Sequence, residues 1–209
     1  MQHFVIAITR KCGCGGTTIG QLLADEFDIN MYDRELLQLA SEDSGIHLEM
    51  FEKADERMKG SLLYRISKRV YGGELIAPES NDFTSDENLF NYQAKVLREL
   101  ARDESYVVIG RAADFILKGL PNVFSFFLFA DESDCVARIK NKMCYSQSEA
   151  MKYIKKTDKF RSEYYTYHTG QKWEDPLHYD LSINTSKLGV QKTAKLIQEY
   201  IKFHISDLL

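Results

Sequence analysis

Long apolar runs are absent from this chain of 209 residues. None of its apolar stretches approaches the ~18 residues that a helix needs to cross a bilayer, and residues 1–20 lack the basic start and long apolar stretch of a secretion signal. An excess of positive charge is also absent, because 31 Asp and Glu outnumber 27 Lys and Arg. This balance argues against a protein whose main task is to grip duplex nucleic acid. We therefore expect a cytoplasmic protein that binds neither a membrane nor nucleic acid.

Cysteine is scarce as well. The four cysteines (Cys12, Cys14, Cys135 and Cys144) do not make a disulfide framework in a chain of this length. Cys12 and Cys14 lie two residues apart, but no second Cys or His pair at zinc-binding spacing accompanies them. We expect both to be small loop residues. The alternative for Cys14 is a redox-sensitive thiol whose pKa is lowered by a nearby helix N-terminus.

Short apolar runs alternate with segments of helical spacing along the chain. With 44% hydrophobic residues, the chain should bury a sizeable core as one α/β domain with an elaboration. Apolar strands joined by helices indicate a parallel sheet covered on both faces, with ligands at the carboxyl ends of the strands. The strands are expected at residues 4–8, 29–32, 106–109, 123–129 and 181–183.

A glycine-rich segment, Arg-Lys-Cys-Gly-Cys-Gly-Gly-Thr-Thr-Ile-Gly, follows the first apolar run at residues 10–20. Glycines let backbone N–H groups converge on an anion, and a helix N-terminus adds partial positive charge. The register is close to the P-loop pattern G-x-x-x-x-G-K-[ST]. Aligning Thr17 with its last position puts Gly16 where the lysine belongs and Arg10 where the first glycine belongs. The alternative is a flexible glycine turn between strand and helix.

Two segments depart from the simple alternation. Residues 45–103, between the second and third strands, are expected to be largely helical, with a mobile loop around Gly72-Gly73 and from Pro78 to Ser85. Residues 138–161 carry eight basic residues against two acidic ones. Such unbalanced charge on a helix repels itself unless an anion is near, although a solvated helix face is the alternative.

Several short motifs occur together in a fixed order, and they run over nearly the whole chain. They are Thr9-Arg10 with Gly13-Cys14-Gly15-Gly16, Tyr32-Asp33-Arg34-Glu35-Leu36, Ile109-Gly110-Arg111 with Asp114, Lys155-Lys156-Thr157-Asp158-Lys159-Phe160-Arg161, Tyr164-Tyr165, Thr169-Gly170 with Trp173, and Tyr179-Asp180-Leu181 leading to Asn184. Taken together, they resemble the cytidylate-kinase-like family of P-loop proteins, which are relatives of the nucleoside monophosphate kinases. The resemblance implies one three-layer α/β P-loop kinase domain over residues 1–209, with a mostly parallel five-stranded sheet. It also implies a helical acceptor-binding insertion at 45–103 and a basic lid at 138–170.

The resemblance also implies ATP and Mg²⁺ as ligands and a set of site residues. Phosphoryl transfer depends mainly on positioning and on positive charge around the transferring group. The donor phosphates are expected on Gly13, Cys14, Gly15, Gly16, Thr17 and Thr18, with the Thr17 hydroxyl as one ligand of an octahedral Mg²⁺. Acceptor binding is carried over to Asp33, Arg34, Gly110, Arg111 and Asp114; for Asp33 the alternative is a helix N-cap. Catalytic roles are expected for Arg10, Lys156 and Arg161.

Arg10 is the candidate to replace the missing P-loop lysine, because its side chain can fold back toward the glycine loop and stays charged at physiological pH. The alternative is that Arg10 pairs with a carboxylate such as Asp33 and only braces the loop.

The function expected from these residues is ATP-dependent transfer of a phosphoryl group to a nucleoside monophosphate, cytidylate-like, or to a related small phosphorylated acceptor. The alternative is a weakly active or inactive nucleotide-binding protein that serves as a sensor or as a partner-binding subunit. Gly16 in place of the lysine motivates this alternative.

Overall fold

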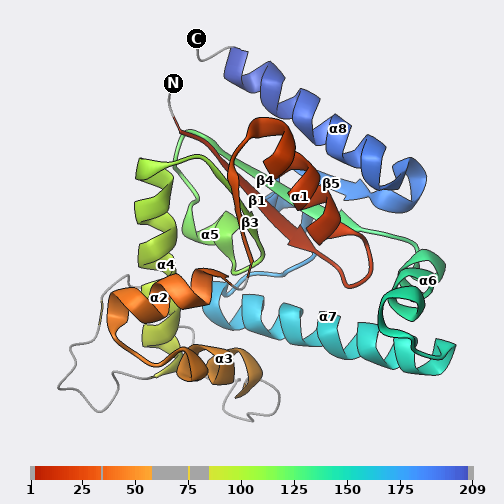
Figure 1. Cartoon of the computed structure of the whole chain (residues 1–209), viewed down its shortest axis with the longest axis horizontal. Helices are drawn as coiled ribbons and strands as arrows, with labels where there is room; N and C mark the ends of the chain where they lie inside the picture. Colours follow the sequence, from red (N-terminus) through yellow and green to blue (C-terminus); the bar gives the residue numbers. More distant parts are fainter. Residues whose placement is uncertain (1–2, 34, 58–74, 76–84, 207–209) are drawn as a thin grey trace.

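A five-stranded parallel sheet forms the centre of the molecule (Figure 1). The computed structural model describes residues 3–33, 35–57, 75 and 85–206. The strand order is β2-β3-β1-β4-β5, and every neighbouring pair is parallel. The strands are β1 (Val5–Arg10), β2 (Asn30–Tyr32), β3 (Tyr106–Ile109), β4 (Val123–Phe129) and β5 (Leu181–Asn184). The predicted α/β fold with a mostly parallel sheet is therefore confirmed, and the sheet is parallel throughout.

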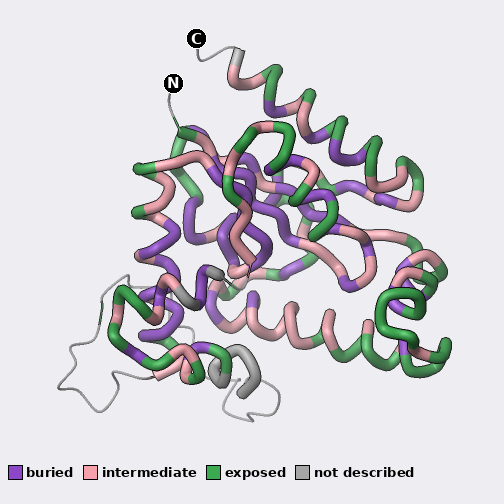
Figure 2. The backbone as a smooth tube through the Cα atoms, viewed as in Figure 1, coloured by how far each residue is buried: buried purple, intermediate pink, exposed green. Residues whose placement is uncertain are grey.

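Alternate residues of each strand face opposite sides of the sheet and build two cores. On one face, Ile6 and Ile8 pack with Ile19 and Leu23 of α1 (Gly16–Phe27) and with Ile197 of α8 (Thr185–Ser206). On the other face, strand residues such as Val5, Ala7 and Val108 pack with buried residues of the helices α2 (Glu35–Ser44), α4 (Asp86–Asp103) and α5 (Ala113–Ile116). Figure 2 shows buried residues concentrated in the strands and in the helix faces against them. Two helical layers thus cover the sheet.

Three helices come from the region between β2 and β3, namely α2 (Glu35–Ser44), α3 (Leu48–Arg57) and α4 (Asp86–Asp103). The α4 helix begins at the N-cap Ser85, whose side chain accepts a hydrogen bond from Asn88 N. Its buried face, including Leu89 and Leu97, belongs to the core on its side of the sheet. Part of the expected insertion is therefore core structure. The expected loop at Gly72-Gly73 and most of Pro78 to Ser85 lie outside the described residues.

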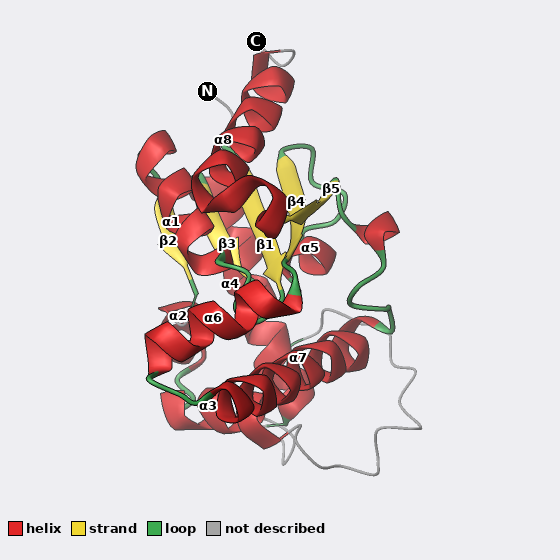
Figure 3. Cartoon of the chain, turned by 90° about the vertical axis from the view of Figure 1, so that its right-hand side faces the viewer, coloured by secondary structure: helices red, strands yellow, loops and turns green. Residues whose placement is uncertain are grey.

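A short helix, α5 (Ala113–Ile116), follows β3, and the basic segment forms α6 (Glu132–Met143) and α7 (Gln147–Thr169). The α7 helix opens with a capping box between Ser146 and Glu149 and ends at the left-handed Gly170. Figures 1 and 3 show α6 and α7 beyond the carboxyl ends of the strands, where α7 runs across that end of the sheet. None of the described helices is long and apolar enough to span a membrane.

Candidate phosphate-transfer site

The glycine loop after β1 is held in a shape that requires glycine. Gly13 and Gly15 have φ of 81° and 89°, in the left-handed region. A Cβ on Gly13 would lie 2.8 Å from the carbonyl oxygen of Cys135 in α6. Two loop carbonyl oxygens are already bonded: Gly13 O accepts from Arg138 Nη1 (3.0 Å), and Cys14 O accepts from the Thr185 hydroxyl (2.7 Å). These contacts hold the loop in a defined turn that leads into the N-terminus of α1.

Cys14 is part of this loop, between Gly13 and Gly15, and is fully buried. Burial raises the pKa of its thiol to about 11, against smaller lowering effects from the Gly16 backbone and from Arg161. The low-pKa, redox-sensitive thiol considered from the sequence is therefore wrong, because the loss of solvent outweighs the helix N-terminus. Cys12 is also buried and forms no disulfide with a described residue.

Two cavities lie over the carboxyl ends of the strands. The first, of about 390 Å³, opens on the glycine loop and is lined by Arg10, Lys11, Cys12, Gly13, Gly15, Gly16, Thr17, Thr18, Arg138, Ile139, Lys142, Met143, Tyr153 and Arg161. The second, of about 490 Å³, opens on the end of β3 and is lined by Thr9, Arg10, Thr17, Asp33, Gly110, Arg111, Ala112, Lys142, Tyr153, Thr157, Phe160, Arg161, Tyr164, Tyr165 and Trp173. Both volumes fall in the range of small-molecule sites.

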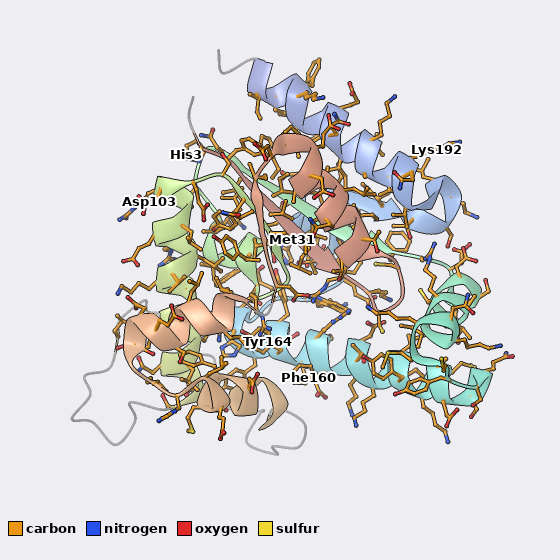
Figure 4. All side chains as sticks on the ribbon, viewed as in Figure 1. His3, Met31, Asp103, Phe160, Tyr164 and Lys192 are labelled. Atoms are coloured by element: carbon orange, nitrogen blue, oxygen red, sulfur yellow. The ribbon has the colours of Figure 1, made fainter. Side chains whose placement is uncertain are left out.

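The two cavities adjoin. Five residues line both of them: Arg10, Thr17, Lys142, Tyr153 and Arg161. Three of these five are cations, and they come from three different elements, β1, α6 and α7. Positive charge is therefore concentrated where the two cavities meet. Figure 4 labels Phe160 and Tyr164 on α7, the helix that contributes the aromatic side of the second cavity.

Arg111 lies in a strained turn at the second cavity. Gly110, Arg111 and Ala112 have φ of 74°, 60° and 52°, so three successive residues are left-handed and two of them carry side chains. Each such residue costs of the order of 1 kcal/mol and persists where the surrounding structure enforces it, often at functional sites. The buried strand β3 on one side and the buried helix α5 on the other enforce this turn. The enforced backbone conformation therefore fixes the position of the Arg111 Cα atom, from which the side chain extends.

Arg10 connects the two cavities. Its Nη2 lies 3.6 Å from Asp33 Oδ1, and its side chain is 17% exposed. Its Nε is buried and has no hydrogen-bond partner among the described residues. Burial and the charge of Arg161 lower the pKa of Arg10 to about 9, and the Asp33 carboxylate opposes this shift. Arg10 stays charged at neutral pH, but protein carboxylates compensate it only in part, so a bound anion would complete its environment.

Arg10 and Gly16 are in steric contact, which bears on the missing lysine. A Cβ on Gly16 would lie 2.8 Å from Arg10 Cβ and 2.9 Å from Arg10 Cγ. A lysine at 16 therefore cannot coexist with the observed Arg10 side chain. The two departures from the P-loop pattern, Arg10 for the first glycine and Gly16 for the lysine, are one linked exchange.

The α7 helix is bonded directly to the glycine loop. Asp158 Oδ1 accepts a hydrogen bond from Cys12 N (2.7 Å), and Arg161 Nη1 donates to Arg10 O (3.0 Å). Burial raises the pKa of Asp158, while its hydrogen bond with Cys12 and the charge of Arg161 act against that rise. The basic segment therefore lies over the loop, held by a carboxylate as well as by a guanidinium.

Most of the residues predicted from the sequence meet at these cavities. Gly13, Gly15, Gly16, Thr17 and Thr18 line the first cavity, and Asp33, Gly110 and Arg111 line the second. Cys14 and Asp114 are buried and line neither, and Lys156 is exposed on α7 and is not among the lining residues. Arg34 lies outside the described residues.

Several residues that line the cavities were given no site role from the sequence, notably Arg138, Lys142, Tyr153, Thr157 and Phe160, although Thr157 and Phe160 belong to the motif at 155–161. Arg138 and Lys142 belong to the basic run of 138–161, so the run itself was the available signal. Tyr153 carried no such signal.

The donor set at the cavities suits a magnesium–phosphate complex better than a metal bound by protein alone. Across the described residues, no three His, Cys, Asp or Glu side chains gather as metal ligands. Thr17 and Asp33 line the second cavity and offer a hydroxyl and a carboxylate. Mg²⁺ in kinases keeps waters and phosphate oxygens and takes only one or two protein ligands, so these residues fit it.

Solved structures with a similar fold include small-molecule kinases and an uncharacterised protein. A crystal structure of an uncharacterised protein from Eubacterium ventriosum is 26% identical, with a TM-score of 0.70, covering 96% of this chain and 99% of that one. Shikimate kinase from Bacteroides thetaiotaomicron is 14% identical (TM-score 0.51, covering 95% and 98%). A gluconokinase from Sinorhizobium meliloti is 13% identical (TM-score 0.51, covering 100% and 97%). The last two show the fold alone.

No curated protein matches this chain. The family described as "Cytidylate kinase-like family" matches this chain over residues 5–187, which include the glycine loop, the Gly110-Arg111 turn and α7. By this match the chain belongs to the cytidylate kinase-like family.

Proposed function

We propose that the protein transfers the γ-phosphate of ATP to a nucleoside monophosphate or a related small phosphorylated acceptor. The observation that carries the proposal is the pair of adjoining cavities with three cations at their junction. One cavity opens on a phosphate-binding loop and the other on the Arg111 turn. Transfer to a phosphorylated acceptor requires the donor and acceptor phosphates to meet in line, with positive charge around the transferring group, and this arrangement suits both conditions.

Each cavity has a distinct role in this proposal. The glycine loop and the N-terminus of α1 bind the donor phosphates through backbone N–H groups. The Arg111 guanidinium binds the acceptor phosphate, because its planar fork matches two phosphate oxygens. Aromatic residues of α7, such as Phe160 and Tyr164, form the wall against which an acceptor base would lie. When bound, Mg²⁺ would neutralise phosphate charge at Thr17 and Asp33.

Arg10 and Arg161 supply charge at the junction. Arg10 takes the part of the P-loop lysine, since its aliphatic chain occupies the space beside Gly16 and its guanidinium lines both cavities. Arg161 adds a second cation from α7 and excludes water from the transferring group. Lys142 lines both cavities and can support them, whereas Lys156 lines neither.

A second function, nucleotide binding without transfer, is favoured by one observation. Arg10 already has a carboxylate neighbour in Asp33. If that pair persists with nucleotide bound, Arg10 only braces the loop. The donor phosphates are then without the cation that would replace the P-loop lysine.

A panel assay separates the two functions. Purified protein is incubated with γ-labelled ATP, Mg²⁺ and each common nucleoside or deoxynucleoside monophosphate in turn, and labelled diphosphate is measured. Transfer to at least one acceptor is expected, and it would exclude the binding-only function. ATP binding measured by calorimetry, without transfer to any acceptor, would favour the binding-only function.

A further inference from the structure

A buried hydrogen-bond network lies beneath the second cavity. Asp114 Oδ1 accepts from the Thr9 hydroxyl (3.2 Å), and Asp114 Oδ2 accepts from the Tyr165 hydroxyl (2.6 Å). Asp114 is 7% exposed and does not line the cavity, whereas Thr9 and Tyr165 do. Its carboxylate therefore contacts protein groups only. Burial raises the pKa of Asp114, and the bonds from Tyr165 and Thr9 oppose this effect.

Each member of the network lies close in sequence to an arginine of the site. Thr9 directly precedes Arg10 at the end of β1. Asp114 lies three residues after Arg111, within the short helix that fixes the left-handed turn. Tyr165 lies one helical turn after Arg161 on α7. The network thus joins the three chain segments that carry the three guanidinium groups.

We propose that Asp114 is a positioning residue that holds Arg10, Arg111 and Arg161 at their mutual distances through its bonds to Thr9 and Tyr165. This inference rests on the proposed phosphoryl transfer and replaces the role of substrate ligand expected for Asp114. Three cations repel one another, and Asp33 beside Arg10 and Asp158 beside Arg161 offset part of that repulsion. The network adds a further tie between the three segments when no phosphate holds them together. A buried carboxylate that accepts two hydroxyl hydrogens supplies a tie of this kind, since charge-assisted hydrogen bonds are the strong ones.

A purely structural role makes a different prediction from a positioning role. A buried tyrosine that donates one hydrogen bond stabilises the fold wherever it lies. Tyr106 is the matched example, since its hydroxyl donates to Leu97 O at 2.7 Å within the core. Tyr106 lies on the strand that leads to Arg111, but its hydroxyl bonds to Leu97 in α4, away from the network. Removing the Tyr106 hydroxyl should therefore lower stability without breaking a bond between the arginine segments.

The test compares Asp114→Asn, Tyr165→Phe, their double variant and the control Tyr106→Phe. The first readout is the Nε–Hε NMR signal of Arg10, Arg111 and Arg161 in the ligand-free protein. Asp114→Asn and Tyr165→Phe should each shift all three signals, and the double variant should shift them no further than Asp114→Asn does. Tyr106→Phe should leave them at the wild-type positions while lowering the thermal midpoint. Unshifted signals in both network variants, or equal shifts in Tyr106→Phe, would overturn the proposal.

The second readout is kinetic and uses the acceptor found in the panel. Asp114→Asn should lower kcat by about 10- to 100-fold, because small misplacements of catalytic groups have effects of this size, while the ATP KM changes little. A kcat equal to that of Tyr106→Phe would contradict the positioning role. If the wild-type protein transfers phosphate to no acceptor, the proposed function fails, and the ligand-free NMR signals still decide whether Asp114 positions the arginines. If Asp114→Asn does not fold, Tyr165→Phe carries both readouts.

Discussion

At the residue scale, the contact between Arg10 and Gly16 makes a prediction about stability. The effect of Gly16→Ala on the free energy of unfolding should reverse its sign when the Arg10 side chain is removed. Gly16→Ala places a Cβ 2.8 Å from Arg10 Cβ. The overpacking should lower the free energy of unfolding by about 1–3 kcal/mol. In an Arg10→Gly background the space is free, and Gly16→Ala should stabilise the first turn of α1 by up to ~1 kcal/mol. Denaturant unfolding of the four proteins measures this cycle, and an equal effect of Gly16→Ala in both backgrounds would contradict the steric link.

Arg111 makes a second prediction at this scale. Arg111→Lys keeps the charge and leaves the left-handed backbone at φ 60° as strained as before. It loses the planar fork, so the acceptor KM should rise by at least ~10-fold while the ATP KM changes by less than about 2-fold. Initial rates with each substrate varied in turn give both constants. Equal changes in the two constants would refute acceptor binding by Arg111.

Individual residues were predictable from the sequence where a pattern points to them, as with the departures at Arg10 and Gly16. That these two side chains touch could not be predicted, because it depends on how β1 meets α1. The buried position of Asp114 was equally hidden, since its partners Thr9 and Tyr165 lie 105 and 51 residues away. Pattern reasoning assigned Asp114 to the ligand, whereas tertiary packing places it under the cavity.

At the element scale, α7 is tied to the glycine loop through Asp158. Asp158→Ala removes the hydrogen bond from Cys12 N and leaves the one from Arg161 Nη1 to Arg10 O between helix and loop. Amide hydrogen exchange of residues 152–165 should then become at least about 10-fold faster, because the helix opens locally more often. Glu163→Ala on the same helix is the matched control, since it removes a surface contact with Lys159 that lies at 3.8 Å. Similar exchange in both variants would show that Asp158 does not hold the helix.

Element positions were largely predictable because continuous apolar runs mark buried parallel strands. The strands at 106–109 and 123–129 have the predicted bounds, whereas β1 continues to Arg10 through its pairing with β4. The capping box of Ser146 and Glu149 shows that Glu149, counted from the sequence only as a charge opposing the basic run, has a structural role at the start of α7. A charge count cannot reveal which acidic residues are used in this way.

At the scale of the whole molecule, the burial of His168 should make the stability of the fold depend on pH. Its ring stacks on Phe90 of α4 with centroids 4.0 Å apart, and burial lowers the pKa of His168 to about 3. The unfolded chain takes up a proton near pH 6.5 that the folded protein does not, so stability falls as pH drops from about 6.5 toward 3. At pH 5 the loss from this group is about 2 kcal/mol.

His168→Phe keeps an aromatic ring against Phe90 and cannot be protonated. Chemical denaturation at pH 7 and pH 5 should therefore show a smaller loss of stability in His168→Phe than in the wild type. Equal losses in the two proteins would mean that other groups determine the acid sensitivity. Asp114 acts in the opposite direction, since its raised pKa favours the folded state as pH falls.

The proposed function depends on Arg10 acting in place of the P-loop lysine during phosphate transfer. The most direct measurement is kcat for transfer from γ-labelled ATP to the panel's best acceptor, for wild type, Arg10→Gly, Arg10→Gly/Gly16→Lys and Lys11→Ala. Lys11 is the control cation, because it is adjacent in sequence and is paired with Glu174 at 2.9 Å. We predict that Arg10→Gly lowers kcat by about 10²-fold, as expected for loss of one preorganised charge. The double variant, which restores the full P-loop pattern, should recover most of that loss, and Lys11→Ala should cost far less. No transfer by the wild type to any acceptor, or equal losses in Arg10→Gly and Lys11→Ala, would contradict the claim.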